Sequence, residues 1–131
     1  MKHRPALLLI ACLLASFFLF GCKSEPVTRN LNSVLEFYSD GNRLEATVRE
    51  LTIDGDDASV RFRVVNRGES EIPSLKLAVR FLDASGSELY TDDVSASFAP
   101  PLAVGDSKSI TADCSGERVG EIERVSIASA E

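Results

Sequence analysis

The sequence predicts an all-β domain, a small antiparallel β-sandwich built from short strands. Apolar and polar residues alternate with period two through Val60, Phe62 and Val64, and again through residues 75–81. This alternation is typical of strands with one buried and one solvated face, as in antiparallel sheets. Turn-forming residues separate the strands at short intervals. Together these patterns indicate a sandwich or barrel and not a helical bundle.

The segment from residue 31 to 42 fits two local structures. Its apolar residues recur at i, i+3, i+4 and i+7, which is helical spacing. Leu35 and Phe37 also alternate before Asp40-Gly41, and residues 44–46 alternate after that pair, which is the pattern of a β-hairpin. Both alternatives stay open on the sequence alone.

The strands that follow are separated by turn residues. The apolar positions change phase between Val48 and Leu51, so we expect a β-bulge near Arg49-Glu50. Turns are predicted at 54–57 and 83–86, where Asp and Gly supply the backbone geometry that tight turns need. Later strands are predicted at 88–95, 107–113 and 119–128, with a break of the chain at Pro100-Pro101 after Phe98.

The N-terminal segment has the composition of a secretory signal. Residues 1–4 are basic at Lys2 and Arg4, residues 6–20 carry no charge, and Gly21-Cys22 precedes polar sequence. The apolar run is short for a transmembrane helix, which needs about 20 residues. Removal of residues 1–21 leaves 12 of the 14 basic residues and all 20 acidic ones, so the formal charge changes from −6 to −8. This acidity argues against a nucleic-acid partner.

The four residues Leu19-Phe20-Gly21-Cys22 resemble the lipobox of bacterial lipoproteins, a resemblance that covers only the N-terminal signal. It implies that the peptide is cut before Cys22 and that the thiol of Cys22 carries a diacylglycerol. Fatty acids such as palmitate would then hold the protein at the membrane. Two or more acyl chains anchor a protein stably where one does so only marginally. Lys23 replaces the Asp that retains enteric lipoproteins at the inner membrane, which favours the outer membrane, facing the periplasm or the surface.

We therefore expect a signal peptide at 1–21, a lipidated Cys22 with a tether to residue 30, and a β-sandwich domain at 31–131. Within that domain, residues 60–110 resemble a bacterial immunoglobulin-like module of the FxLYD type. The matching residues are Val65-Asn66 with Gly68, Phe81-Leu82-Asp83 with Gly86, and Leu102 with Gly105. The resemblance implies an immunoglobulin-like sandwich with Asn66 and two glycines at hairpin ends and Phe81 in the core. It implies no catalytic chemistry.

The chain after the signal offers little for catalysis, because the only histidine of the sequence is His3, which lies within the signal. Nucleophilic sites that rely on imidazole, and zinc sites built on His, are therefore excluded. The adjacent Ser107-Lys108 would point to opposite faces of a strand. The aspartates at 54–57 and 92–93 lack the spacing of an EF-hand loop and are interpreted as solvated positions. We expect no enzyme activity, no metal and no cofactor.

One group of cations is a candidate binding surface. Four basic residues fall on solvated positions of two predicted strands: Arg61, Arg63, Lys76 and Arg80. If these strands share a sheet, the four cations line one surface suited to lipid head groups or acidic glycans. The plainer interpretation is cross-strand ion pairing, with each pair worth less than about 1 kcal/mol.

These features together predict a lipid-anchored, non-catalytic binding or accessory module of the cell envelope. Its expected partners are the membrane and another envelope protein or an anionic envelope polymer. One alternative is a small carboxylate-dependent hydrolase. Another is a structural subunit that associates through a strand edge or through Cys114, the thiol left once Cys12 is removed and Cys22 is lipidated. Partial burial of Cys114 is the simpler expectation.

Overall fold

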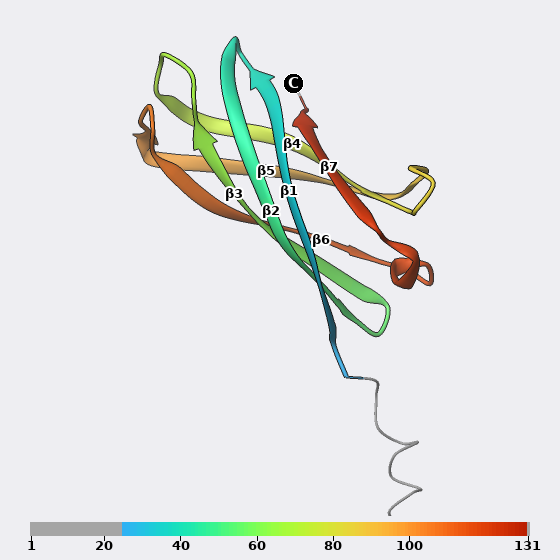
Figure 1. The fold of residues 1–131 in the computed structure, drawn as a ribbon. Helices are drawn as coiled ribbons and strands as arrows, with labels where there is room; N and C mark the ends of the chain where they lie inside the picture. Colours follow the sequence, from blue (N-terminus) through green and yellow to red (C-terminus); the bar gives the residue numbers. More distant parts are fainter. Residues whose placement is uncertain (1–24, 131) are drawn as a thin grey trace, which may run out of the picture.

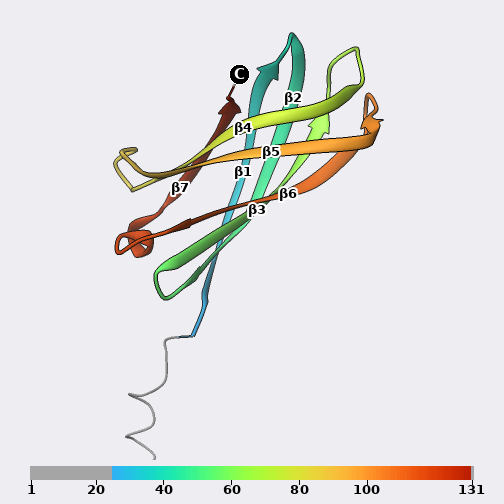
Figure 2. The ribbon, with the colours of Figure 1, turned by 180° about the vertical axis from the view of Figure 1, so that it is seen from behind.

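The computed structural model describes residues 25–130. The predicted signal peptide at 1–21 and the lipidation at Cys22 lie outside these residues. Within them the chain forms two antiparallel sheets that face each other (Figures 1 and 2). In the described range, no helix has the length and apolarity that a membrane crossing requires.

The sandwich consists of seven strands and one short 3-10 turn. In chain order these are β1 (Val27–Ser39), β2 (Asn42–Asp54), β3 (Asp57–Asn66), β4 (Ile72–Leu82), β5 (Glu88–Leu102), β6 (Ser107–Ser115), η1 (Val119–Glu121) and β7 (Arg124–Ser129). One sheet has the order β1-β2-β3-β6 and the other the order β5-β4-β7. The strands β1, β2 and β3 lie in front of β4 and β5 in Figure 1 and behind them in Figure 2. The predicted all-β antiparallel sandwich is confirmed.

The connections interlock the two layers. Hairpins join β1 to β2 and β2 to β3, but the chain then changes sheet between β3 and β4, between β5 and β6, and between β6 and β7. As a result β3 pairs with β6 in one sheet, and β4 pairs with β7 in the other. Crossings of this Greek-key kind are typical of immunoglobulin-like sandwiches.

The ambiguous segment forms the β1–β2 hairpin. Ser39 pairs with Asn42, and Asp40 and Gly41 have φ angles of 53° and 83°. Two positive φ values in a two-residue loop are the requirement of the hairpin turn that Asp-Gly favours. Of the two structures that the sequence left open, the hairpin is therefore the one formed.

The domain begins earlier than the predicted residue 31. Strand β1 starts at Val27, which pairs with Ile53, so the last four residues of the predicted tether belong to the sheet. Thr28 and Asn30 are exposed on an edge strand, where polar residues are tolerated. Their polar composition is therefore similar to that of a linker. A register shift between Asn30 and Ser33 further hides the alternation.

Two later boundaries also differ from expectation. Pro100-Pro101 does not break β5, which continues to Leu102 with a shift of register against β4. The edge position of β5 explains this, because an edge strand tolerates residues that lack an N–H donor. The predicted strand at 119–128 is split into η1 and the shorter β7. The turns at Gly55 and Gly86 are where the sequence placed them.

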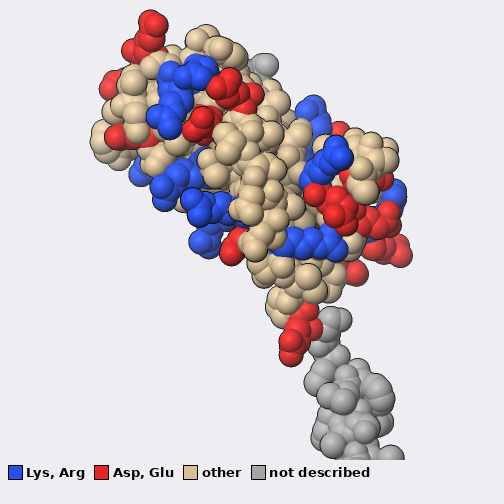
Figure 3. Space-filling view, in the orientation of Figure 1, with Lys and Arg blue, Asp and Glu red and all other residues tan. Residues whose placement is uncertain are grey.

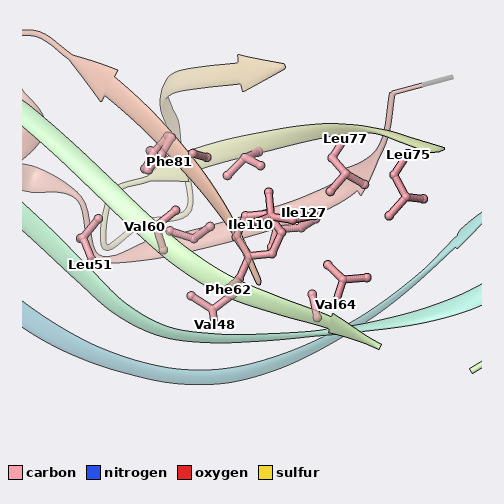
Figure 4. Packing of buried hydrophobic residues seen from close by; sticks show 14 of the residues in the cluster. Val48, Leu51, Val60, Phe62, Val64, Leu75, Leu77, Phe81, Ile110 and Ile127 are labelled. Atoms are coloured by element: carbon pink, nitrogen blue, oxygen red, sulfur yellow. The ribbon is translucent and has the colours of Figure 1, made fainter. Parts of the chain in front are cut away.

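The core lies between the sheets and is apolar. Figure 4 shows Phe62 of β3 pointing toward residues of the opposite sheet such as Leu77 and Ile127. Phe62 is 1% exposed and Phe81 is fully buried, as the FxLYD resemblance implied for Phe81. Burial of one such side chain stabilises the fold by about 1.5–3 kcal/mol.

A buried asparagine fixes the end of β3. The amide nitrogen of Asn66 donates to the carbonyls of Ser70 (2.8 Å) and Leu102 (3.0 Å), and its Oδ1 accepts from the N–H of Gly68 (2.9 Å). Asn66 therefore joins the β3–β4 connection to the end of β5. The hairpin end implied by the resemblance is wrong for Asn66, because the chain crosses between sheets there.

Candidate functional site

The structure separates the four predicted cations into two pairs. Arg61 and Arg63 belong to β3 of the four-stranded sheet, whereas Lys76 and Arg80 belong to β4 of the three-stranded sheet. All four side chains are exposed, and the residues next to them along each strand are buried in the core. The two pairs therefore point outward on opposite faces of the sandwich. The expected single surface with four cations is therefore wrong. Alternation shows which face of a strand is wet but not which sheet the strand joins.

A third arginine joins Arg61 and Arg63. The register of β2 against β3 shifts between Val48 and Glu50, which confirms the predicted bulge. Because a bulge adds one residue to a strand, Arg49 and Glu50 are both exposed although they are consecutive. Glu50 pairs with Arg61 in the register of the sheet. We call Arg49, Arg61 and Arg63 the arginine cluster.

The arginine cluster surrounds a shallow depression on the outer face of the four-stranded sheet. The depression has a volume of about 360 Å³ and is lined by Arg49, Glu50, Arg61, Phe62, Arg63 and Ser109. Arg63 pairs in register with Ser109, and Arg61 with Thr111, both on β6. The site thus combines guanidinium donors with hydroxyl groups, which suits anionic oxygen ligands.

The three arginines of the cluster form no ion pair with an acidic side chain among the described residues. Within residues 25–130, ion pairs join Arg29 to Glu123, Arg43 to Glu36, Arg67 to Glu45, Arg80 to Glu88 and Arg118 to Glu121. No member of the cluster takes part in one of these pairs, and neither does Lys76. Among the four cations chosen from the sequence, ion pairing therefore accounts only for Arg80, whose Nε lies 3.2 Å from Glu88 Oε1.

The charges of the molecule are unevenly distributed. Figure 3, seen from the side of β1 and β2, shows a group of Lys and Arg side chains on the left flank and mixed acidic and basic side chains on the right flank. At the end where β1 begins, Asp54, Asp56 and Asp57 are exposed in the β2–β3 turn. In the part of the chain that the structure describes, no three His, Cys, Asp or Glu side chains are grouped to hold a metal.

The other polar candidates have structural surroundings. Asp57 Oδ1 accepts a hydrogen bond from the hydroxyl of Ser115 (2.7 Å), and Asp92 Oδ2 accepts one from the N–H of Asp113 (2.9 Å). Ser107 pairs with Val65 and Lys108 with Val64, so these two side chains point to opposite faces as alternation predicted.

The thiol of Cys114 is half-buried near the end of β6. Burial, and next the negative charge of Asp92, raise the pKa of this thiol to about 11. The group is therefore protonated at neutral pH, and a protonated thiol is a poor nucleophile. The partial burial expected from the sequence agrees with this environment.

Comparison with known proteins gives no relative: no family model matches the sequence, and no curated protein or solved structure is significantly similar to it. The functional argument therefore depends on the residues of this chain.

Proposed function

We propose that the protein is a lipid-anchored lipoprotein of the bacterial cell envelope whose sandwich acts as a non-catalytic binding or accessory module. The observation that carries this proposal is the N-terminal pattern, in which a basic head and an uncharged run end at Gly21-Cys22. The first strand begins at Val27, only five residues after Cys22. A fully extended chain of five residues spans at most about 17 Å, so the anchor would hold the domain close to the bilayer.

The character of the domain supports a binding role over catalysis. The chain after the signal has no imidazole, and the acidic candidates occupy exposed turns and strand positions. Residues 27–129 are accounted for by one sandwich with an apolar core. Recognition would therefore use the outer faces and the loops, of which the arginine cluster is the strongest candidate. Lys23 after the lipidated cysteine supports an outer-membrane location.

The anchor is tested by the full-length chain with Cys22→Ala, produced in a bacterial host fed with labelled palmitate. The parent protein should incorporate the label and sediment with membranes, and Cys12→Ala serves as the matched control because it lies inside the removed segment. Cys22→Ala should lack the label and retain residues 1–21. Labelling of Cys22→Ala to the level of the parent would contradict the proposal.

The membrane assignment has a separate test in an enteric host. Density-gradient fractionation should place the parent in the outer membrane, and Lys23→Asp should move it to the inner membrane. A parent protein found in the inner membrane would contradict this part of the proposal while leaving the anchor intact.

A further inference from the structure

The outer face of the four-stranded sheet carries more than the arginine cluster. Two large apolar side chains are exposed on the same face: Val34 is 62% exposed and Tyr38 is 61% exposed, both on β1. Val34 pairs with Thr47, Thr47 with Arg63, and Arg63 with Ser109. One row across all four strands therefore presents an apolar group, a hydroxyl, a guanidinium and a second hydroxyl.

This combination matches the chemistry of a lipid bilayer surface. Guanidinium groups bind phosphate oxygens strongly, and tyrosine is enriched where one end of a side chain meets an apolar phase and the other meets water. The depression among the arginines is open, and all three guanidinium groups are exposed on the outer face, where a membrane surface can reach them.

The tether places this face within reach of the membrane. It joins β1, which is the edge strand of the same four-stranded sheet. Asn30 pairs with Glu50 and Glu50 with Arg61, so the row of Arg61 lies only three residues along β1 from Val27. At about 3.3 Å per residue this distance is about 10 Å. A tether of up to about 17 Å is long enough for the outer face of the four-stranded sheet to turn toward the membrane.

The other orientations are less favourable at an anionic surface. If the domain stands on its tethered end, the exposed Asp54, Asp56 and Asp57 come closest to the lipid and are repelled. The outer face of the three-stranded sheet presents Lys76, but the charge of Arg80 is paired with Glu88, and Asp93 is exposed beside Ala78. On the outer face of the four-stranded sheet, the three arginines of the cluster stand against Glu50 and Asp113, while Glu36 and Glu45 form ion pairs with two other arginines.

We propose that the outer face of the four-stranded sheet is a membrane-contact surface, with Arg49, Arg61 and Arg63 bound to the phosphates of anionic lipids. This inference rests on the proposed lipid anchor, which supplies proximity, whereas the arginine cluster sets the orientation. Each basic residue near an anionic bilayer contributes a factor of about five in occupancy. Three arginines opposed by Glu50 and Asp113 leave one net positive charge and therefore favour the face-down orientation by about fivefold on anionic over zwitterionic lipid.

The test uses the lipidated protein extracted from membranes and incorporated into vesicles of phosphatidylcholine with or without phosphatidylglycerol. With Cys114→Ser as background, a fluorophore is attached at Ser109→Cys on the four-stranded sheet or at Ser95→Cys on the opposite face, and lipids with brominated chains quench it. Quenching at residue 109 should exceed that at residue 95 when phosphatidylglycerol is present. The difference should vanish in the triple variant Arg49→Glu, Arg61→Glu, Arg63→Glu.

Two control variants separate charge from structure. The triple exchange of the same arginines to lysine should keep the difference in quenching, and Lys76→Glu should leave it unchanged. Equal quenching at residues 95 and 109 would overturn the inference, as would a difference that survives the three glutamates. So would cluster-dependent binding to a soluble acidic glycan without any difference in quenching. If the parent protein fails to float with either kind of vesicle, the lipid anchor itself is refuted.

Discussion

Replacement of Asn66 by leucine should cost the domain about 3 kcal/mol of unfolding free energy. Asn66 is fully buried, and its side chain makes three hydrogen bonds, two to carbonyls and one to an N–H. Each contributes about 1 kcal/mol net, and the carbonyl of Leu102, whose bond is buried, loses a partner that water cannot easily replace. Leucine has a similar size but restores none of these bonds.

The assay is equilibrium urea unfolding of residues 23–131, followed by circular dichroism, with Asn30→Leu as the control at an exposed position. Asn66→Leu should lower the unfolding midpoint without changing the slope, and Asn30→Leu should leave it within about 0.5 kcal/mol. A loss at Asn66 no larger than that at Asn30 would refute the reasoning.

Asn66→Asp adds a pH signature to the same argument. The new carboxylate would face the carbonyls of Ser70 and Leu102 in a buried place, so its pKa in the folded state should rise above the unfolded value. The folded state then binds more protons, and its stability relative to the parent should recover as the pH falls. Parallel stability curves for Asn66→Asp and the parent between pH 4 and pH 7 would contradict this account.

Three further predictions follow from local contacts. Gly116→Ala should lower the free energy of unfolding by about 1–3 kcal/mol in urea, because the added Cβ would overlap the ring and hydroxyl of Tyr90. That hydroxyl also accepts a hydrogen bond from the N–H of Arg118. Gly120→Ala is the control, because the space around Gly120 is open. The rate of alkylation of Cys114 by iodoacetamide should rise with a midpoint near pH 11 in the folded protein. The free energy of unfolding should fall as the pH rises above the ordinary thiol pKa of about 8.5, because the folded state keeps the thiol proton to higher pH than the unfolded state. An alkylation midpoint in the folded protein equal to that in urea would disprove this. The pKa of Asp83 is lowered from 3.8 because the hydroxyl of Ser85 and the N–H of Ser87 donate hydrogen bonds to its carboxylate. In NMR spectra the amide resonances of the β4–β5 turn should therefore shift with a midpoint below pH 3.8, and Asp83→Asn should abolish this pH-dependent shift.

Much of the fold could be predicted because alternation and turn chemistry are local properties. The bulge at Arg49-Glu50 was visible as a change of phase, and the Asp-Gly pairs marked two hairpin turns. The β1 segment stayed ambiguous because its apparent helical stripe mixes two faces. Of the residues in that stripe, Leu31 and Leu35 pack against the core, whereas Val34 and Tyr38 are exposed on the outer face.

The candidate site was only half predictable, because it depends on strand pairing. Arg61 and Arg63 lie where the sequence placed them, on the wet face of β3. Lys76 and Arg80 lie on a different sheet, and no periodicity in the sequence reveals that the chain crosses between layers after Asn66. Alternation does not mark Arg49 as a member of the cluster, although a bulge is predicted at Arg49-Glu50. Two consecutive charged residues at a change of phase were the signal that both would be exposed.

The most direct test of the account is the intact mass of the protein extracted from the membranes of its native host. The account predicts a chain that begins at Cys22, with a mass increased by a diacylglycerol and by any acyl group on the new amine. A mass that still includes residues 1–21, or a Cys22 without fatty acid, would contradict it.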